Sequence, residues 1–388
     1  MPEAVILSAV RTPIGRFLGG LAEVPAPRLG AVVVREAVRR AGVAPEEVDE
    51  VILGNILSAG LGQAPARQAA RYAGLPDSVG AVTVNKMCGS GLKAVVLAAQ
   101  AIRAGDGRVY VAGGMENMSR APYLLPRARM GYRLGHGEVQ DSMILDGLWD
   151  PYRDCHMGSC AELLAAEYRI SRQDQDAYAE RSYRLALQAL DAGRFRPETV
   201  PVEADGKHVE EDEEPRRVQF DRIPTLKPAF ERDGTVTAAN ASSISDGAAA
   251  VVVAERSVAD RVGTRPLARV VGYAQAATAP EWFTIAPAAA IERLLERVGW
   301  RKEDVDLYEI NEAFAAVVLG VCRKLGLSLD AVNVHGGAVA LGHPIGASGA
   351  RILTTLLYAM QQRDARRGVA AICLGGGEAV AVAVEREA

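Results

Sequence analysis

The sequence is poor in cysteine, histidine and large aromatic residues: its 388 residues include five Cys, five His, three Trp and six Phe. An odd number of cysteines without paired spacing argues against a disulfide framework and favours a reducing compartment. No run of about 18 apolar residues occurs, so no membrane-spanning helix is predicted. The N-terminus also lacks the pattern of a signal peptide. We therefore expect a soluble, cytoplasmic protein with no membrane partner.

Positive charge is not in excess either. The formal net charge is −4, so the chain as a whole does not attract nucleic acid, and none is expected as a partner. Any anionic ligand must therefore be bound by a local cluster of Arg or Lys. No Walker sequence is present, and no glycine-rich segment matches G-x-G-x-x-G with a following acidic residue. A nucleotide-binding fold of that type is disfavoured.

What the sequence does contain is an internal repeat. Residues 36–49 and 293–306 share Gly, Glu, Val and Asp at one constant offset, and residues 90–116 are echoed by 348–378. In each copy an expected helix leads to an apolar strand that ends in a Gly-Gly-x-Glu or Gly-Gly-Gly-Glu segment. Alternating helices and strands predict an α/β layered fold. Two similar halves predict pseudo-twofold symmetry, with a cleft where the halves meet.

The segment between the halves, about 119–245, differs in character. It is rich in Arg, Asp, Glu and Pro, and is interpreted as an inserted, loop-rich subdomain that shapes ligand specificity. Spaced apolar residues predict one amphipathic helix over about 173–192. The acidic run over 210–214 is interpreted as a solvated loop.

Cys88 is the strongest candidate for a nucleophile. An apolar strand over 82–84 runs into Asn85-Lys86-Met87-Cys88, and Gly89-Ser90-Gly91 then opens a helix. Backbone N–H groups and the helix dipole at such a turn favour a thiolate, so a lowered thiol pKa is expected. The glycines also let an acyl group approach the backbone closely.

His343 and Cys373 lie in two other glycine-rich segments. His343 stands in Gly342-His343-Pro344-Ile345-Gly346, where a neutral imidazole can accept the Cys88 proton. Cys373 ends an apolar strand before Gly375-Gly376-Gly377. Its thiol can move a proton at a carbon beside a carbonyl, and the N–H of Gly375 can bind an oxyanion. Two thiols and one imidazole suit acyl transfer through a thioester, followed by carbon–carbon bond chemistry.

Two further groups have alternative interpretations. Asn311 precedes an expected helix, where it serves either as an N-cap or as an amide that orients a water in the site. Cys155, His156 and Cys160 resemble part of a metal site, but no second cluster completes four ligands. No metal is therefore expected.

These segments together resemble the thiolase family, the acetyl-CoA acetyltransferases and 3-ketoacyl-CoA thiolases. The resemblance runs nearly end to end and is highly specific because its motifs occur in order. One departure is Glu378-Ala379, which replaces a more frequent small or Met-Gly pair and bears on the acyl chain length. The motifs lie at residues 10–15, 85–93, 113–119, 234–242, 311–314, 336–351 and 373–377.

The resemblance implies a duplicated α-β-α-β-α layered fold with an inserted loop domain. The N-terminal half would comprise 1–118 plus 246–266, the coenzyme A-binding loop domain 119–245, and the C-terminal half 267–388. It also implies a ping-pong mechanism in which Cys88 is acylated and Cys373 exchanges a proton with the second substrate. One oxyanion hole would consist of His343 and a water held by Asn311, the other of the N–H groups of Cys88 and Gly375.

The resemblance further implies which residues contact coenzyme A. Coenzyme A would be a substrate and not a tightly bound cofactor. Arg216 is similar to a residue that meets the coenzyme A phosphates, with Arg217 or Arg222 as substitutes. The remaining positions that match contacts near the acyl group or pantetheine are His156, Met157, Phe230, Ser242 and Phe314.

The resemblance favours an acyl-CoA:acetyl-CoA C-acyltransferase of short chains, because His156-Met157 is similar to the acetoacetyl-CoA type. A broader or longer-chain 3-ketoacyl-CoA thiolase of fatty-acid breakdown is the alternative. A non-catalytic lipid or acyl-CoA carrier on this fold is a remote one, since it would not need Cys88, His343 and Cys373 together. Family members are dimers or dimers of dimers, so a homodimer or homotetramer is expected.

Overall fold

The computed structural model describes residues 2–204 and 206–387, and its centre is a ten-stranded mixed sheet. Nine strands form a continuous path in the order β14-β15-β16-β13-β1-β12-β5-β3-β4, and the short β2 (Gly15–Arg16) pairs with β12. The strands of the path are β1 (Ala4–Arg11), β3 (Glu50–Gly54), β4 (Gly80–Val84), β5 (Val109–Asn117), β12 (Ser245–Glu255), β13 (Ala268–Ala277), β14 (Leu307–Ile310), β15 (Arg367–Leu374) and β16 (Glu378–Glu385).

The pairing pattern repeats on the two sides of the β1–β13 junction. On one side β1, β12 and β5 pair antiparallel, and β5 then pairs parallel with β3. On the other side β13, β16 and β15 pair antiparallel, and β15 then pairs parallel with β14. The junction itself is short, with Val5 opposite Arg269 and Ile6 opposite Ala268. The duplication expected from the sequence is therefore present in the topology.

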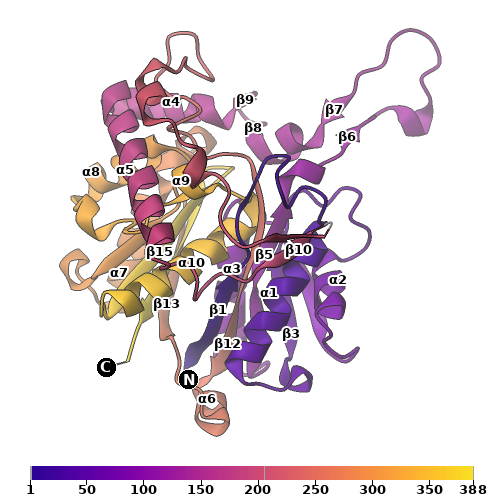
Figure 1. The fold of residues 1–388 in the computed structure, drawn as a ribbon, viewed down its shortest axis with the longest axis vertical. Helices are drawn as coiled ribbons and strands as arrows, with labels where there is room; N and C mark the ends of the chain where they lie inside the picture. Colours follow the sequence, from indigo (N-terminus) through magenta and orange to yellow (C-terminus); the bar gives the residue numbers. More distant parts are fainter. Residues whose placement is uncertain (1, 205, 388) are drawn as a thin grey trace.

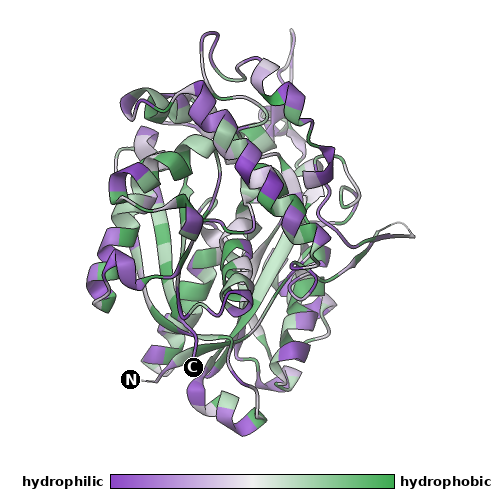
Figure 2. Ribbon diagram, turned by 60° about the vertical axis from the view of Figure 1, so that its left-hand side comes forward, coloured by the Kyte–Doolittle hydropathy of each residue, from purple (hydrophilic) through white to green (hydrophobic). Residues whose placement is uncertain are grey.

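Helices form a layer between the two halves of the sheet and cover the outer face of each half (Figure 1). The helices α3 and α10 form the central layer, where their apolar side chains pack against strands of both halves. On the outer faces, α1 and α2 cover the N-terminal half, and α7 and α8 cover the C-terminal half. Figure 2 shows the apolar residues concentrated on the strands and the central helices. These helices are α1 (Ala26–Ala41), α2 (Pro65–Tyr72), α3 (Ser90–Ala104), α7 (Ala286–Val298), α8 (Ala315–Leu325) and α10 (Ile345–Gln362).

The two central helices touch near their first turns because glycine occupies both contact positions. A Cβ on Gly91 would lie 2.8 Å from the backbone nitrogen of Ala350, and a Cβ on Gly349 would lie 2.4 Å from that of Leu92. Side chains at these positions would push the helices apart. This approach brings the turn before α3 and the turn before α10 together, at the meeting of the two halves.

The described residues of 119–245 form long loops, two α-helices, several short 3₁₀ or π-helical turns and three short hairpins. Helix α5 (Arg172–Asp191) confirms the amphipathic helix expected over 173–192, and Ser171 caps it. Helix α4 (Met157–Glu167) packs on α8, while the β6–β7 hairpin projects from the molecule (Figure 1). The domain boundaries at 118/119, 245/246 and 266/267 stay a prediction. The hairpin strands are β6 (Tyr123–Leu124), β7 (Gln140–Asp141), β8 (Trp149–Asp150), β9 (Cys155–His156), β10 (Val202–Ala204) and β11 (Lys207–Val209).

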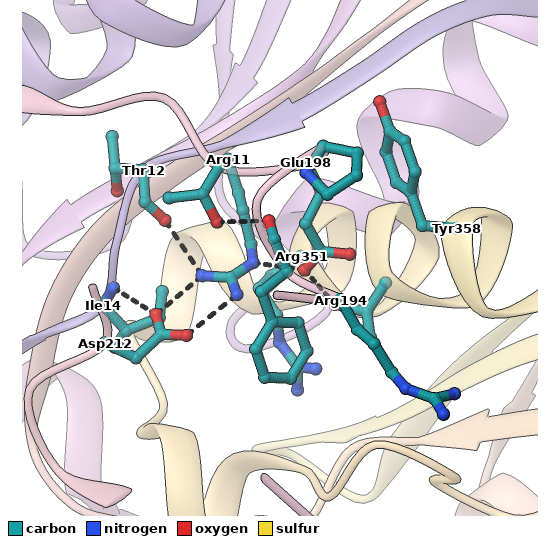
Figure 3. Close-up of polar contacts among 12 residues, drawn as sticks. Arg11, Thr12, Ile14, Arg194, Glu198, Asp212, Arg351 and Tyr358 are labelled. Atoms are coloured by element: carbon teal, nitrogen blue, oxygen red, sulfur yellow. Dashed lines mark hydrogen bonds and ion pairs between the residues drawn. The ribbon is translucent and has the colours of Figure 1, made fainter. Parts of the chain in front are cut away.

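The acidic run over 210–214 is not a fully solvated loop, so that interpretation is wrong for its central residues. Asp212 is buried and accepts hydrogen bonds of 2.7 and 2.9 Å from the guanidinium of Arg11. Glu198 accepts a third bond from Arg11, at 2.5 Å, and one of 3.0 Å from Thr355 of α10. Figure 3 shows Arg11 between these two carboxylates, with α10 beside them. Asp212 thus anchors the run to the N-terminal half, and Glu198 elsewhere in the inserted segment adds a contact with the C-terminal half, which charge alone does not reveal.

No helix in residues 2–204 and 206–387 is long and apolar enough to cross a membrane.

Candidate active site

Cys88 lies where the sequence predicts, in the turn between strand β4 and helix α3. Met87, just before it, has a φ of 45°, in the left-handed region that a non-glycine residue adopts at some energetic cost. Two local bonds maintain this turn: Met87 N donates to Asn85 Oδ1 at 3.1 Å, and Ser90 Oγ donates to the Met87 carbonyl at 2.6 Å. The strained residue turns the half-buried Cys88 thiol toward a pocket.

The expectation of a lowered thiol pKa at Cys88 is wrong. Burial raises the pKa of Cys88 to about 12, and this outweighs the opposing hydrogen bonds from the backbone of Cys88 itself and of Gly375. The thiol is therefore protonated at neutral pH and needs a base before it can act as a nucleophile. The Gly375 contact also shows that the N–H predicted to bind an oxyanion points at the Cys88 sulfur.

His343 lies on the wall of the same pocket, at the turn before α10. Burial, and secondarily the charge of Arg351, lower the pKa of His343 to about 3, so its imidazole is neutral and able to accept a proton. Its Nδ1 lies 2.5 Å from Ser348 Oγ, and that hydroxyl also lies 2.9 Å from the Pro344 carbonyl, to which it donates. Because the Ser348 hydroxyl donates its own proton to the Pro344 carbonyl, it accepts a hydrogen bond from Nδ1–H of His343. The lone pair of His343 then lies on Nε2.

Asn311 lies next to His343 but does not cap a helix. Helix α8 begins at Ala315, after Phe314, so the N-cap interpretation of Asn311 is wrong. Its side chain is buried, and its Nδ2 lies 3.5 Å from His343 Nε2. Among the described residues its Oδ1 has no hydrogen-bond partner. The amide is thus directed into the site, with an acceptor free for a water or a substrate group.

Cys373 is buried at the end of β15, and Gly375 follows it at the head of the glycine segment. Burial raises the pKa of Cys373, and the charge of a Cys88 thiolate raises it further. The two sulfur atoms, 285 residues apart in sequence, therefore lie within electrostatic reach of each other. Gly375 lies between Met157 and Met87, since a Cβ on it would meet the terminal methyl of each at 3.5 Å.

An apolar cavity of about 360 Å³ joins these groups to the inserted segment. His156 stacks on Phe230, with ring centroids 4.6 Å apart, and Phe230 meets Phe314 edge-on at 6.0 Å. Burial lowers the pKa of His156, so it is neutral in this wall. The cavity is also lined by Ala241 and Ala313. Seven of the lining residues are ones that the sequence assigns to catalysis or acyl-CoA binding: Cys88, His156, Met157, Phe230, Ser242, Phe314 and His343.

Arg216 lies outside that cavity. Its half-exposed guanidinium pairs with Asp191 at 2.9 Å and with Glu211 at 3.2 Å. Arg217 and Arg222 line a second depression of about 250 Å³, which shares Ala238 with the apolar cavity. The three arginines are close together in the sequence, but only Arg217 and Arg222 line the depression next to the cavity.

Two supporting residues were not identified from the sequence as part of the site. Ser348 orients His343, and the repeat that pairs it with Ser90 was the available signal. Glu116 ends the Gly-Gly-x-Glu segment, and its buried carboxylate accepts hydrogen bonds from the backbone of Ile56, Leu57 and Gly346 and from the Asn55 amide. Glu116 thus connects the loop after β3 to the turn that carries His343.

No group of three or more His, Cys, Asp or Glu side chains suited to hold a metal ion is found in residues 2–204 and 206–387.

Comparison with known proteins gives a consistent result. A family model described as thiolase, N-terminal domain, matches residues 4–257, and one described as thiolase, C-terminal domain, matches 264–386. Acetyl-CoA acetyltransferases of Cupriavidus necator and Pseudomonas aeruginosa are 53% and 52% identical to the chain, over the full length of both partners.

Two solved structures share the fold. The acetyl-CoA acetyltransferase of Bacillus anthracis superposes with a TM-score of 0.97 at 45% identity, covering 99% of each chain. A thiolase of Ascaris suum in complex with coenzyme A gives 0.96 at 46% identity, covering 99% of this chain and all of the other. The layered fold expected from the resemblance is confirmed. Since family models and full-length relatives together span nearly every residue, the chain belongs to the thiolase family.

Proposed function

We propose that the chain is an acyl-CoA:acetyl-CoA C-acyltransferase that makes and cleaves short 3-ketoacyl-CoA, most readily acetoacetyl-CoA, through an acyl-Cys88 intermediate. One observation carries the proposal: Cys88 and His343 line one apolar cavity, where the Gly375 N–H points at the Cys88 sulfur and the Cys373 thiol is in electrostatic reach. The full-length relatives named acetyl-CoA acetyltransferase support the same reaction.

The first half-reaction forms the thioester. Neutral His343 accepts the Cys88 proton through Nε2 while the sulfur attacks the thioester carbonyl of an acyl-CoA. The N–H groups of Cys88 and Gly375 donate to the oxygen of the tetrahedral intermediate. Coenzyme A then leaves as a thiol with the proton of Cys373, so Cys373 becomes a thiolate and His343 keeps the Cys88 proton on Nε2. Because the resting pKa of Cys88 is about 12, proton removal and attack are coupled in one step, and no standing thiolate is required.

The charge coupling between the thiols sets the order of the two half-reactions. A Cys88 thiolate raises the pKa of Cys373, so the second thiol resists ionisation while the first carries charge. An acyl group on Cys88 removes that charge. Acylation therefore lowers the pKa of Cys373 relative to that state and lets Cys373 ionise more readily when the second substrate arrives.

The second half-reaction forms the carbon–carbon bond. The Cys373 thiolate takes a proton from the methyl group of acetyl-CoA, and the carbanion attacks the acyl carbon on Cys88. The carbon–sulfur bond to Cys88 then breaks, and the Cys88 sulfur recovers its proton from His343. The enolate oxygen is stabilised by His343 and by a water that Asn311 holds, which supplies the donors that so weak a carbon acid needs. In the reverse direction Cys88 attacks the 3-keto carbon, Cys373 returns a proton to the departing acetyl-CoA carbanion, and coenzyme A then takes the acyl group from Cys88.

The pantetheine arm is proposed to lie in the cavity against His156, Met157, Phe230, Ser242 and Phe314, with the phosphates near the arginines of the 216–222 stretch. The surface ion pairs of Arg216 cost little to break, about 0–1 kcal/mol each, so Arg216 stays the predicted contact beside Arg217 and Arg222. Separate Ala variants at the three positions identify the phosphate contact. It is the arginine whose loss raises the KM for coenzyme A most and weakens its dependence on salt.

Acyl length separates this proposal from the longer-chain alternative. Thiolysis rates are measured with acetoacetyl-CoA and with a long-chain 3-ketoacyl-CoA. A rate that falls steeply with length is expected; a flat or rising profile would assign the chain to the broader 3-ketoacyl-CoA thiolases of fatty-acid metabolism. Mass spectrometry after mixing with acetyl-CoA tests the intermediate, since the acetyl group is expected on the tryptic peptide 87–93. A chain that binds acyl-CoA without acylation there would be a carrier.

We further propose that the chain works in the cytoplasm as a homodimer or homotetramer. Strand β4 ends the sheet with its outer edge unpaired among the described residues, and Val82 in it is 40% exposed. An exposed apolar edge is an assembly surface. Light scattering coupled to gel filtration gives the mass directly, and a monomer would contradict the assembly.

A further inference from the structure

Cys155 and Cys160 form a thiol pair that the reaction does not use. Their sulfur atoms lie 3.9 Å apart. Cys155 is half-buried in β9, whereas Cys160 is completely buried in the second turn of α4. No other hydrogen-bonding contact between two cysteine sulfurs occurs in the part of the chain that the structure describes. Proximity combined with one accessible partner distinguishes this pair from the other cysteines.

Helix geometry explains why the two thiols meet. His156 is the N-cap of α4, because its Nδ1 accepts the Gly158 N–H at 3.1 Å. Cys155 therefore lies at N′ and Cys160 at N4, the two positions whose side chains pack together across the start of a helix. Apolar residues normally make this contact. Here both positions carry a thiol, so the fold itself holds the two sulfurs side by side.

The surroundings of the pair favour one thiol as the first to react. Cys155 meets solvent in part. Cys160 lies 3.9 Å from Asp150 Oδ2, and burial with the neighbouring charges of Cys155 and Asp150 raises its pKa to about 12. Cys160 is thus a poor first nucleophile but is well placed to attack an oxidised Cys155. Asp150 and the two thiols do not form a group suited to a metal ion in residues 2–204 and 206–387.

We propose that Cys155 and Cys160 are a modification site that a peroxide converts to an intrachain disulfide. The Cys155 sulfur attacks one peroxide oxygen, which forms a sulfenic acid and releases an alcohol, or water from hydrogen peroxide. The Cys160 sulfur then attacks the Cys155 sulfur and displaces the hydroxyl as water. The two thiols lose two hydrogens and two electrons, and the peroxide takes up both.

The disulfide would act on the substrate cavity. His156 and Met157 lie between the two cysteines in sequence, and both line the cavity. Bonding draws the sulfurs from 3.9 Å to about 2 Å, so the start of α4 must shift with the ring of His156. This consequence rests on the proposed function, whereas the bond itself does not.

The experiment exposes the folded full-length chain to hydrogen peroxide, alkylates the remaining thiols under denaturing conditions and digests with trypsin. Both cysteines fall on peptide 154–169, while Cys88, Cys322 and Cys373 fall on 87–93, 303–323 and 368–386. We expect peptide 154–169 to lose two hydrogens and to resist alkylation at exposures that leave Cys322 alkylated. Cys322 is the matched control, since it is also buried but has no neighbouring thiol among the described residues.

Two variants complete the test. Cys160→Ser should leave Cys155 as a sulfenic or higher acid, and Cys155→Ser should leave Cys160 alkylated. Alkylation of both thiols in the wild-type chain after exposure, or oxidation of Cys155 without a bond to Cys160, would overturn the proposal. In the bridged chain we expect a raised KM for acyl-CoA that dithiothreitol reverses. Oxidation of Cys88 lowers kcat and not KM, so it does not mimic this effect. An unchanged KM would contradict the effect of the disulfide on the cavity but not the formation of the disulfide.

Discussion

The turn over 85–91 and the turn over 343–349 occupy equivalent places in the two halves but carry different chemistry. Each leads into a central helix, and Ser90-Gly91 corresponds to Ser348-Gly349. At the same offset Cys88 corresponds to Gly346, and His343 to Asn85. The proposed nucleophile thus belongs to one copy of the turn and its proposed base to the other. A duplicated scaffold makes a site only where the two copies face each other.

The C-terminal turn has no room for a nucleophile at the equivalent position. A Cβ on Gly346 would lie 2.7 Å from Glu116 Oε2 and 2.9 Å from the Met115 carbonyl. The Gly346 N–H donates to the same Glu116 oxygen at 2.9 Å. In the N-terminal turn Cys88 therefore faces the cavity, whereas in the C-terminal turn the equivalent Gly346 packs against Glu116 of the opposite half.

The two serines serve the two turns differently. Ser90 Oγ accepts from Lys86 N at 2.8 Å and donates to the Met87 carbonyl, so both of its bonds maintain the backbone. Ser348 Oγ bonds one backbone carbonyl and, in addition, the imidazole of His343. The same residue type is structural in one copy and orients the base in the other.

The largest effect is expected from loss of the nucleophile. Cys88→Ala should lower kcat by at least about 10⁴-fold, as the loss of a covalent nucleophile does in other enzymes, while coenzyme A still binds. Stopped assays of thiolysis and a binding titration measure the two quantities. Gly346→Ala is the matched change in the other turn. It should lower the free energy of unfolding by about 1–3 kcal/mol through overpacking.

A loss of coenzyme A binding in Cys88→Ala, with turnover intact, would contradict the assignment of the nucleophile. A Gly346→Ala variant as stable as the wild-type chain would show that the docking contact with Glu116 is looser than the structure indicates.

The next effect separates the two serines. Ser348→Ala should lower kcat by roughly 10–100-fold, the usual range for a residue that orients a reactive group, with little change in KM. Without the Ser348 hydroxyl, His343 Nδ1 loses the partner that fixes its tautomer. Ser90→Ala removes backbone bonds and should act mainly on stability, by about 1 kcal/mol. Steady-state kinetics and urea unfolding of both variants make the comparison, and equal losses of kcat would contradict it.

Most residues of the candidate catalytic site could be predicted from the sequence, because they lie in glycine-rich turns and at equivalent places of the internal repeat. Cys88, His343 and Cys373 lie at ends of strands or starts of helices, where a local pattern is informative. The pKa of Cys88 could not be predicted, since it depends on how far the turn is buried by the other half. The anchoring role of Asp212 was also hidden, because its partner Arg11 is 201 residues away. Both the pKa of Cys88 and the role of Asp212 depend on contacts between residues far apart in the sequence, which a local sequence pattern does not reveal.

A smaller effect concerns the carboxylate that joins the two turns. Burial raises the pKa of Glu116 to about 7, from the ordinary 4.5. The fold therefore favours the protonated form, and the resulting stability is present below pH 4.5 and lost as the pH rises through 7. Glu116→Gln removes this titration. Between pH 5 and 8 the wild-type chain should lose more stability than the variant, by up to about 3 kcal/mol.

Urea unfolding of both proteins at each pH gives the difference. Asp246 and Glu309 also have pKa values raised by burial, to about 6 and about 8. Glu309 is present in both proteins and cancels, whereas the charge of Asp246 helps to raise the pKa of Glu116 and so contributes to the difference. Parallel pH profiles for the wild-type chain and Glu116→Gln would show that Glu116 stays ionised throughout, held by its four N–H donors.

The smallest effect is expected at Glu378, the residue that follows the glycine segment in the C-terminal half as Glu116 does in the N-terminal half. Its carboxylate is partly exposed and pairs with Lys86 at 2.5 Å. Among the described residues that line the apolar cavity, Glu378 does not occur. Glu378→Gln should therefore cost less than about 1 kcal/mol of stability, as exposed ion pairs do. It should leave the ratio of thiolysis rates for short and long substrates unchanged. A shifted ratio would mean that this ion pair, through the Cys88 turn, sets the acyl length.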